Sequence, residues 1–431
     1  MRPFQMALLV GFGVVALLGL VVFSTYKGSD TAEQDMLASG ITIWGTLPAD
    51  AFTKTIYDVT RTDPRFQSVS YLQKNPATVD RELLEAIADG VSPDLLVISN
   101  ETLYQFMPRL YAIPYASFSK RTFLDTYIDG AEVFMKTDGI YGIPFIVDPL
   151  VLYWNRDLFA TVNLTQPPTT YEDLLRTYIE RLRILENNTI TQATIALGEH
   201  NNVTNAKQIF ALFAIQSGSD MVREENNQFR VTFAEQVEGS SAIPGVAAAQ
   251  FYTAFADPQS VYYTWNRTLP DDISLFSANG LAMRIGFGSE FATIRDRNPN
   301  LNFDIAPIPQ NASASVRRGY GTYYAFAVPQ HAKNPAGSLF VAQTLASAGA
   351  VETIATQLGV APAARSALAA VPENPIDSVR YSAAIIARTW LDPKPTESNA
   401  VFRDMIESIT AGRAQAGSAV NNAVQRIRNL F

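Results

Sequence analysis

Short apolar runs bounded by turn residues alternate along the chain with longer segments in which apolar residues recur at helical spacing. This alternation is typical of an α/β fold that contains parallel strands. Helices are predicted over residues 78–89 and 171–186, and Thr170 can cap the second of them. Asn334 and Pro335 mark a further helix start. The predicted strands cover residues 41–44, 69–72, 94–99, 150–154, 281–285 and 323–328.

The amino terminus carries an apolar segment of a different kind. Residues 6–23 hold no charged or hydrogen-bonding side chain, and as a helix they would measure roughly 27 Å, close to the thickness of a bilayer's hydrocarbon core. Arg2 favours an amino terminus that stays in the cytoplasm. We therefore expect an uncleaved transmembrane anchor in the cell membrane with the body outside the cytoplasm. A cleaved secretory signal, cut after small residues such as Val22 and Ser24, is the alternative. The polar stretch that follows completes an anchor and tether over residues 1–39.

Length and composition exclude several classes of protein and several kinds of site. A chain of 431 residues predicts two or three domains, and 47% hydrophobic with 17% charged residues excludes a disordered protein. The net charge of −8 argues against nucleic acid as a partner. Cysteine is absent, and His200 and His331 are the only histidines, which argues against thiolate or multi-histidine metal sites and histidine-based triads. We therefore expect no metal, no cofactor and no catalytic residue.

Four stretches carry a resemblance to a known family. The last comprises ANGLAMRIGFGSEF, GYGTYYAFAVPQHAKNPAGSLFVAQTLAS, GVAPAARSAL and a terminal segment around Trp390. The first three are ITIWGTLPADAFTKTIYDV, SPDLLVISNETLYQF and GIYGIPFIVDPLVLYWNRDLFATVNLTQPPTTYEDLL. Together the stretches cover about residues 41–431. With these stretches the chain resembles the extracellular solute-binding proteins of ABC importers, specifically the sugar-binding type that includes maltose-binding protein.

The resemblance implies a two-lobed, periplasmic-binding-protein-like α/β fold with a ligand cleft between the lobes. Such lobes close on a ligand by hinge motion, and the ligand shifts the balance toward the closed state. The chain would cross between the lobes near residues 144–150, 317–320 and 347–351. The expected division is residues 40–146 plus 319–348 for the first lobe, and 147–318 plus 349–431 for the second.

Two predicted strands end in residues that suit a ligand site. Trp44 ends the first strand and Thr46 follows it, and Asn100 and Glu101 follow the strand that ends at residue 99. Ligands of open α/β sheets bind at such strand ends, and a sugar needs aromatic faces and oriented polar groups. Core packing of Trp44, and loop capping by Asn100 and Glu101, are the alternatives.

Of three further candidates, Asp148 lies at the first expected crossing, and Phe287 and Glu290 lie just beyond the strand predicted over residues 281–285. Asp148 stands between apolar neighbours, where burial would demand a partner; relatives use an acid here to accept sugar hydroxyls, and a hydrogen bond that braces the hinge is the alternative. Phe287 and Glu290 flank glycines that let backbone approach a ligand. Many sugar binders of the family have tryptophan where this chain has Phe287.

Aromatic residues complete the candidate site. Tyr320 and Tyr323 lie around the second crossing, and strand alternation places Tyr323 and Tyr324 on opposite faces, so at most one of these two faces the cleft. Trp390 is a further aromatic residue on which a sugar ring could stack, and packing within the protein is its alternative role.

The expected function is capture of a small solute, a carbohydrate such as a mono- or oligosaccharide, and its delivery to ABC transporter permease subunits. No Gly-x-Ser-x-Gly, phosphate-loop or His-Glu-x-x-His motif occurs, so we expect no enzyme. A membrane-anchored carbohydrate-active hydrolase with two carboxylates, and a ligand sensor without transport, are the alternatives.

Overall fold

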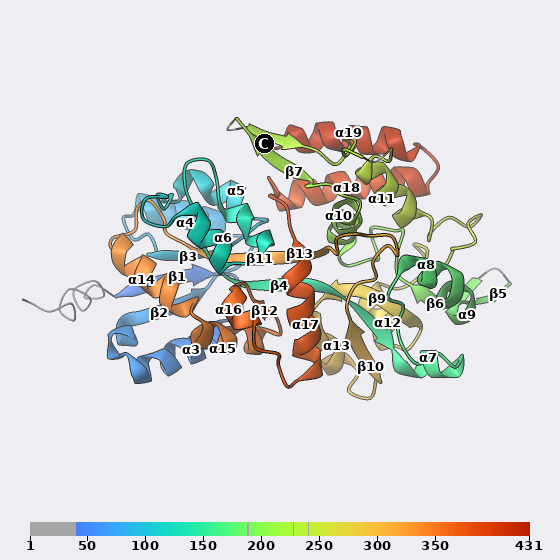
Figure 1. Cartoon of the computed structure of the whole chain (residues 1–431), viewed down its shortest axis with the longest axis horizontal. Coiled ribbons are helices and arrows are strands. Elements are labelled where there is room, and N and C mark those ends of the chain that lie inside the picture. Colours follow the sequence, from blue (N-terminus) through green and yellow to red (C-terminus); the bar gives the residue numbers. More distant parts are fainter. Residues whose placement is uncertain (1–39, 188, 227, 240) are drawn as a thin grey trace, which may run out of the picture.

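The computed structural model describes residues 40–187, 189–226, 228–239 and 241–431; the predicted anchor and tether lie outside these residues. Two lobes lie side by side, joined by strands that run through the centre of the molecule (Figure 1). Eleven strands form a mixed sheet with the main order β2-β1-β3-β11-β4-β9-β6-β5. Separate hydrophobic cores fill the two lobes.

The first lobe is built on a partly parallel sheet. Strand β1 pairs in parallel with β2 and β3, and β11 runs antiparallel to β3 and β4. Its strands are β1 (Ile41–Gly45), β2 (Val69–Gln73), β3 (Leu95–Ser99), β11 (Gly319–Ala327), β12 (Ala361–Pro362) and β13 (Ala387–Arg388). Its α-helices are α3 (Ala49–Thr62), α4 (Val79–Ala88), α5 (Leu103–Phe106), α6 (Lys120–Thr126), α14 (Pro335–Leu345), α15 (Ala348–Leu358) and α16 (Arg365–Leu368), with 3₁₀ turns η1 (Pro64–Ser68), η2 (Met107–Arg109) and η3 (Asp129–Phe134).

The second lobe contains a sheet, a separate hairpin and most of the C-terminal helices. Its strands are β5 (Ile184–Glu186), β6 (Thr189–Ile195), β9 (Leu281–Phe287) and β10 (Phe303–Ala306), with the hairpin β7 (Val222–Glu225) and β8 (Gln228–Val231). Its helices are α7 (Arg156–Thr161), α8 (Tyr171–Asp173), the π-helical η4 (Leu174–Tyr178), α9 (Ile179–Leu182), α10 (Ala206–Gln216), α11 (Pro244–Thr253), α12 (Asp272–Ser277), α13 (Glu290–Arg297), α18 (Pro395–Thr410) and α19 (Ala416–Arg428). Helix α17 (Pro375–Ile386) lies between the lobes, and its Ala383 and Ala384 pack into different cores (Figure 1).

One long strand belongs to both lobes. Strand β4 (Ile143–Asn155) is buried along its whole length. Its first half pairs with β11 and β12, and its second half pairs with β9 and β10. Each lobe therefore completes its sheet with one half of the same strand.

Most of the predicted elements are confirmed, including the helix that starts at Pro335, which Asn334 caps by accepting from the Gly337 amide at 3.0 Å. The strand predicted at 150–154 is the second half of β4, because a strand buried on both faces shows no alternation that marks its start. The helix predicted over 171–186 begins after Thr170 as expected but ends at Leu182, since residues 184–186 pair with β6 as β5.

The third crossing lies elsewhere than predicted. We expected residues 349–431 in the second lobe. Instead Val351 and Ile354 of α15 pack in the first core, and β12 pairs with β4 beside them. The sequence break near Ser347 is a bend of 69° between α14 and α15, not a passage between lobes. The chain returns toward the second lobe through α17, whose Ala383 packs in the second core, and enters that lobe after β13.

Within the described ranges, no single helix has the length and apolar character needed to cross a membrane; α14 and α15 meet that criterion only when taken as one bent pair.

Candidate functional site

A cavity of about 1890 Å³ opens between the lobes. The first lobe contributes the end of β1, the start of α4 and the segment that follows β3. The second lobe contributes the hairpin, the segment before α18 and the end of α19. Among the lining side chains are four carboxylates and four cationic groups: Asp80, Glu101, Glu225 and Glu397, and Arg81, Arg230, Lys394 and Arg428. Charges of opposite sign in equal number suit a polar ligand without large net charge.

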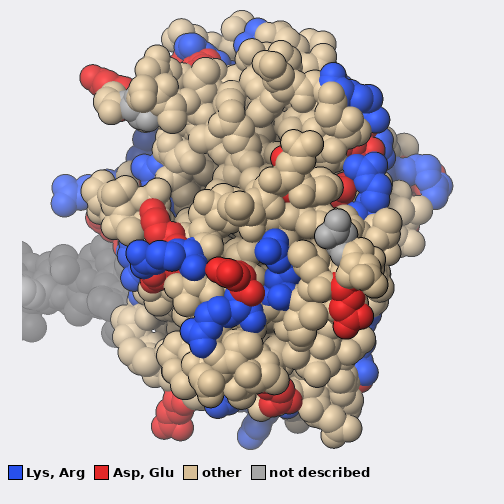
Figure 2. Space-filling view, turned by 90° about the vertical axis from the view of Figure 1, so that its right-hand side faces the viewer, with Lys and Arg blue, Asp and Glu red and all other residues tan. Residues whose placement is uncertain are grey.

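Acidic and basic side chains are also interspersed on the outer face of the molecule that Figure 2 shows, among larger areas of other residues. Elsewhere in the described part of the chain, no cluster of three or more histidine, aspartate or glutamate side chains is placed to hold a metal ion.

Strand β1 brings Trp44 and Thr46 to the cleft. Thr46 lines the large cavity, and both residues line a smaller pocket beside it. The Nζ of Lys74 lies 3.7 Å from the centre of the Trp44 ring, a cation–π contact that covers one ring face. That face of Trp44 is therefore closed to a sugar ring.

Glu101 lines the cleft and also links the lobes. Its Oε1 lies 3.2 Å from Lys207 Nζ and accepts a hydrogen bond from Gln208 Nε2 at 2.9 Å, both on α10. Lys207 is buried and lies 2.7 Å from Asp392, which is fully buried. Burial alone would lower the pKa of Lys207, but the two carboxylates reverse this and hold its pKa above the ordinary value. A ligand that binds Glu101 meets a carboxylate that is already fixed in place.

Asn100 and Tyr323 make contacts within the protein and do not face the cleft. Asn100 is fully buried, and it donates to the Trp390 carbonyl at 3.1 Å and accepts from the Tyr323 amide at 3.0 Å. The Tyr323 hydroxyl donates to the Ala387 carbonyl at 2.9 Å. Neither residue lines the large cavity; Tyr324, on the opposite face of β11, does. Asn100 thus ties β11 to the third crossing.

The remaining aromatic candidates are packed. Tyr320 is fully buried, with its ring centre 6.4 Å from that of the half-buried Phe287. Trp390 is 2% exposed and meets Phe402 edge to face at 6.0 Å. It lines a second cavity of about 460 Å³, between η3 and the hairpin. None of these three lines the large cavity.

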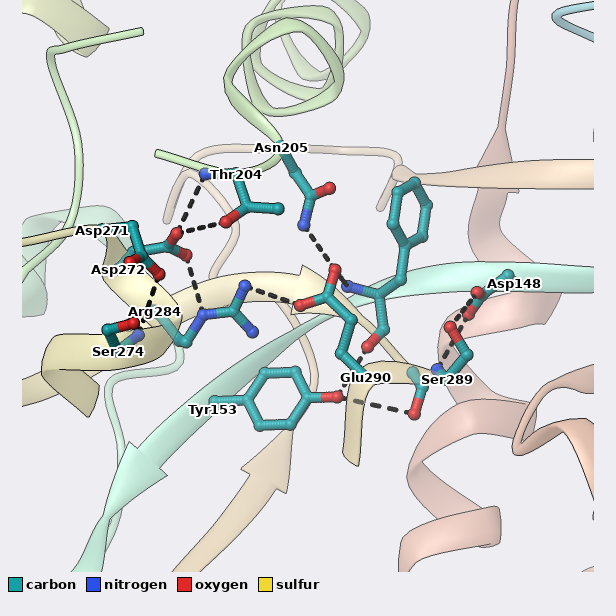
Figure 3. A network of polar contacts seen from close by, with 12 residues as sticks. Asp148, Tyr153, Thr204, Asn205, Asp271, Asp272, Ser274, Arg284, Ser289 and Glu290 are labelled. Atoms are coloured by element: carbon teal, nitrogen blue, oxygen red, sulfur yellow. Dashed lines mark hydrogen bonds and ion pairs between the residues drawn. The ribbon is translucent and has the colours of Figure 1, made fainter. Parts of the chain in front are cut away.

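Asp148 and Glu290 belong to a polar network beside the crossing strands (Figure 3). Asp148 accepts from the Ser289 amide at 3.2 Å and from the Ser289 hydroxyl at 2.5 Å. Glu290 accepts from Asn205 at 2.6 Å and from the Phe287 amide at 3.2 Å. Neither acid lines the large cavity, so both hold the start of α13 against its neighbours.

A buried arginine stands at the centre of this network. Arg284 Nε lies 2.8 Å from Asp272 and its Nη2 lies 2.6 Å from Glu290. Asp272 in turn accepts from the amide and hydroxyl of Thr204, beside the Asn205 that precedes α10. The network therefore fixes the N-terminal end of α10, whose Lys207 and Gln208 contact Glu101.

Three aromatic rings at the cleft were missed by the sequence analysis. Tyr104 of the first lobe meets Phe229 and Phe431 edge to face at 5.5 and 5.0 Å, while Phe229 and Phe431 stack at 5.1 Å. The Tyr104 hydroxyl also donates to the Phe431 carbonyl oxygen. All three rings line the large cavity and join the two lobes. Their positions are too far apart in sequence for any local signal to group them.

Comparison with solved structures supports the fold. A cyclo/maltodextrin-binding protein solved with maltotetraose matches with a TM-score of 0.72 and 14% identity, over 90% of this chain and 96% of that one. The cyclic α-maltosyl-1,6-maltose binding protein of Arthrobacter globiformis matches with a TM-score of 0.72 and 18% identity, over 91% and 98%. The GacH receptor of Streptomyces glaucescens, solved with and without acarbose, matches with a TM-score of 0.66 and 17% identity, over 91% and 98%.

Sequence comparison gives a curated relative and a family. A binding protein of Brucella abortus (strain 2308) is 21% identical over 259 residues, and the match spans 59% of this chain and 58% of that protein's length. The family model for bacterial extracellular solute-binding proteins matches residues 46–352. Members of that family bind solutes and are not enzymes, in agreement with the absence of catalytic motifs. The chain belongs to the bacterial extracellular solute-binding protein family.

Proposed function

We propose that this protein captures a carbohydrate in the cleft between its lobes and delivers it to an ABC-type permease. The observation that carries the proposal is the cavity of about 1890 Å³, lined by carboxylates, hydroxyls and aromatic rings from both lobes. Sugar hydroxyls pair with the carboxylates and hydroxyls, and sugar C–H faces pack on rings. The structural relatives were solved with maltotetraose or acarbose, or are named for a maltose derivative, which supports an oligosaccharide as the solute.

Thr46, Glu101 and Tyr324 are the residues we propose for contact with the sugar, because each lines the cleft. Trp44 would contribute through the smaller pocket. Asn100, Asp148, Phe287, Glu290, Tyr320, Tyr323 and Trp390 would act by holding strands and crossings in place.

A thermal-shift screen of the full chain against mono- and oligosaccharides tests the binding. A sugar at 100 times its dissociation constant should raise the free energy of unfolding by about 2.7 kcal/mol. Glu101→Gln should weaken binding of the same sugar, whereas Glu352→Gln, an exposed change on α15 outside the cleft, should leave it unchanged. Sugars recovered intact by chromatography support a binder. Cleaved products would favour the hydrolase, and binding without uptake through a permease would favour the sensor.

We further propose that residues 6–23 anchor the protein in the cell membrane with its body outside the cytoplasm. The support is the uncharged apolar run after Arg2 and the extracellular character of the family. The full chain should sediment with membranes and stay there in high salt, and deletion of residues 1–39 should release it. A mature protein that begins after residue 23, by mass spectrometry, would identify a cleaved signal instead.

A further inference from the structure

A small pocket opens from the cleft where β1 and β3 end. It has a volume of about 70 Å³, several times the roughly 10–15 Å³ that one water molecule needs. Thr46, Ser99, Thr102 and Tyr324 line both the pocket and the cleft. A ligand in the cleft can therefore extend a substituent of a few atoms into this pocket.

The walls of the pocket are apolar. Val79, Val97 and Phe106 line it and are buried, together with Leu96 and Ile98 of β3. No charged side chain is among the described residues that line it. A carboxylate or an ammonium group would lose its hydration there without a counter-charge, which is unfavourable. The pocket therefore selects a small uncharged group.

Four hydroxyl groups stand where the pocket meets the cleft, and those of Ser99 and Thr102 lie within hydrogen-bond distance of each other. Thr46 and Tyr324 line both spaces, and within the described part of the chain neither hydroxyl has a hydrogen-bond partner in the protein. Burial raises the pKa of Tyr324, so its hydroxyl stays protonated and can donate. A carbonyl oxygen at this position would find donors, and a group attached beyond it would meet the apolar walls.

We propose that the side pocket recognises an acetyl substituent of the bound sugar, with the methyl group against Val97 and Phe106 and the carbonyl oxygen facing the Tyr324 hydroxyl. A bare hydroxyl substituent would leave the apolar walls unfilled. The inference rests on the proposed function, since the acetyl group must be carried by a sugar in the cleft. It names acetylated sugars, N-acetyl or O-acetyl, as the preferred substrate class.

Matched pairs of sugars test the proposal with the full chain by titration calorimetry. Glucose is compared with N-acetylglucosamine, galactose with N-acetylgalactosamine, and cellobiose with diacetylchitobiose. In at least one pair the acetylated member should bind about tenfold or more tightly, the discrimination expected when a small apolar group fills a matching pocket. Mono-O-acetylated glucose shows whether ester and amide acetyl groups are both accepted, and glucosamine should bind more weakly than its N-acetyl form.

Variants that fill the pocket provide the second test. Val97→Ile and Val97→Leu each add volume to a wall that borders the pocket and not the cleft. Each should remove most of the preference for the acetylated sugar, while the affinity for the plain sugar is retained. Val69→Ile, a similar change in β2 outside the pocket, should leave both affinities unchanged. Plain sugars that bind as tightly as acetylated ones, or a pocket variant that weakens both equally, would overturn the inference and leave the proposed function standing. If no sugar binds, the proposed function fails together with it.

Discussion

Replacing Arg284 with methionine will lower the free energy of unfolding by about 3–5 kcal/mol, the cost of removing one partner from a buried ion pair. Arg284 is fully buried, with Asp272 and Glu290 at 2.8 and 2.6 Å. Methionine fills a similar space, yet it leaves Asp272, whose side chain is 1% exposed, as a buried charge without a counter-charge. Urea unfolding followed by tryptophan fluorescence measures the change.

Two variants sharpen this prediction. Arg176→Met removes an exposed partner of Asp173 and should cost less than about 1 kcal/mol. Combining Arg284→Met with Asp272→Asn and Glu290→Gln neutralises the stranded carboxylates, so it should recover part of the lost stability. A loss below about 1 kcal/mol for Arg284→Met alone would contradict the assignment of a tightly coupled network.

Asp148 should make stability fall as the pH rises from about 4 to 7. Burial raises its pKa to about 7, an effect that the hydrogen bonds from Ser289 oppose; Glu290 raises the pKa and Arg380 lowers it. The folded protein therefore holds a proton on Asp148 that the unfolded chain releases near its ordinary pKa of 3.8. The stabilisation is fully present below pH 3.8 and is lost as the pH rises to about 7. A shift of this size corresponds to a few kcal/mol, on the order of 4.

The comparison of wild type with Asp148→Asn isolates this effect. Asparagine resembles the protonated carboxyl in shape and can keep both contacts with Ser289. Between pH 4 and 7 the free energy of unfolding of the variant should therefore rise relative to that of wild type by a few kcal/mol. Above pH 7 the difference should stay constant. Asp296→Asn, an exposed change on the nearby α13, should follow wild type throughout. Parallel profiles for wild type and Asp148→Asn would show that Asp148 does not titrate in this range.

Strand ends were the part of the candidate site most open to sequence reasoning. Thr46 and Glu101 each follow a short apolar run, and the ends of parallel neighbouring strands meet at one edge of a sheet, so local pattern was enough to place both residues. Local pattern was not enough to choose between Tyr323 and Tyr324, because strand alternation places them on opposite faces without showing which face meets the cleft.

Features that depend on distant parts of the chain lay beyond such reasoning. The Tyr104, Phe229 and Phe431 cluster joins three positions with no shared motif. The third crossing was misplaced because Ser347 looks like the end of a lobe, whereas α15 and β12 continue to fill the first core. Asp148 was correctly recognised as a buried acid in need of a partner, but only the fold shows that Ser289 is that partner.

The shared strand β4 has a consequence for how the protein folds during its synthesis. When a ribosome has produced β4, neither β11 nor β12 exists yet, and both β3 and the first half of β4 still lack a neighbour supplied from more than 150 residues downstream. Contacts of such long sequence separation form slowly, and unpaired strand edges promote aggregation in the meantime. The nascent amino-terminal half must therefore remain incomplete until late in translation, and a fragment ending before β11 should be insoluble.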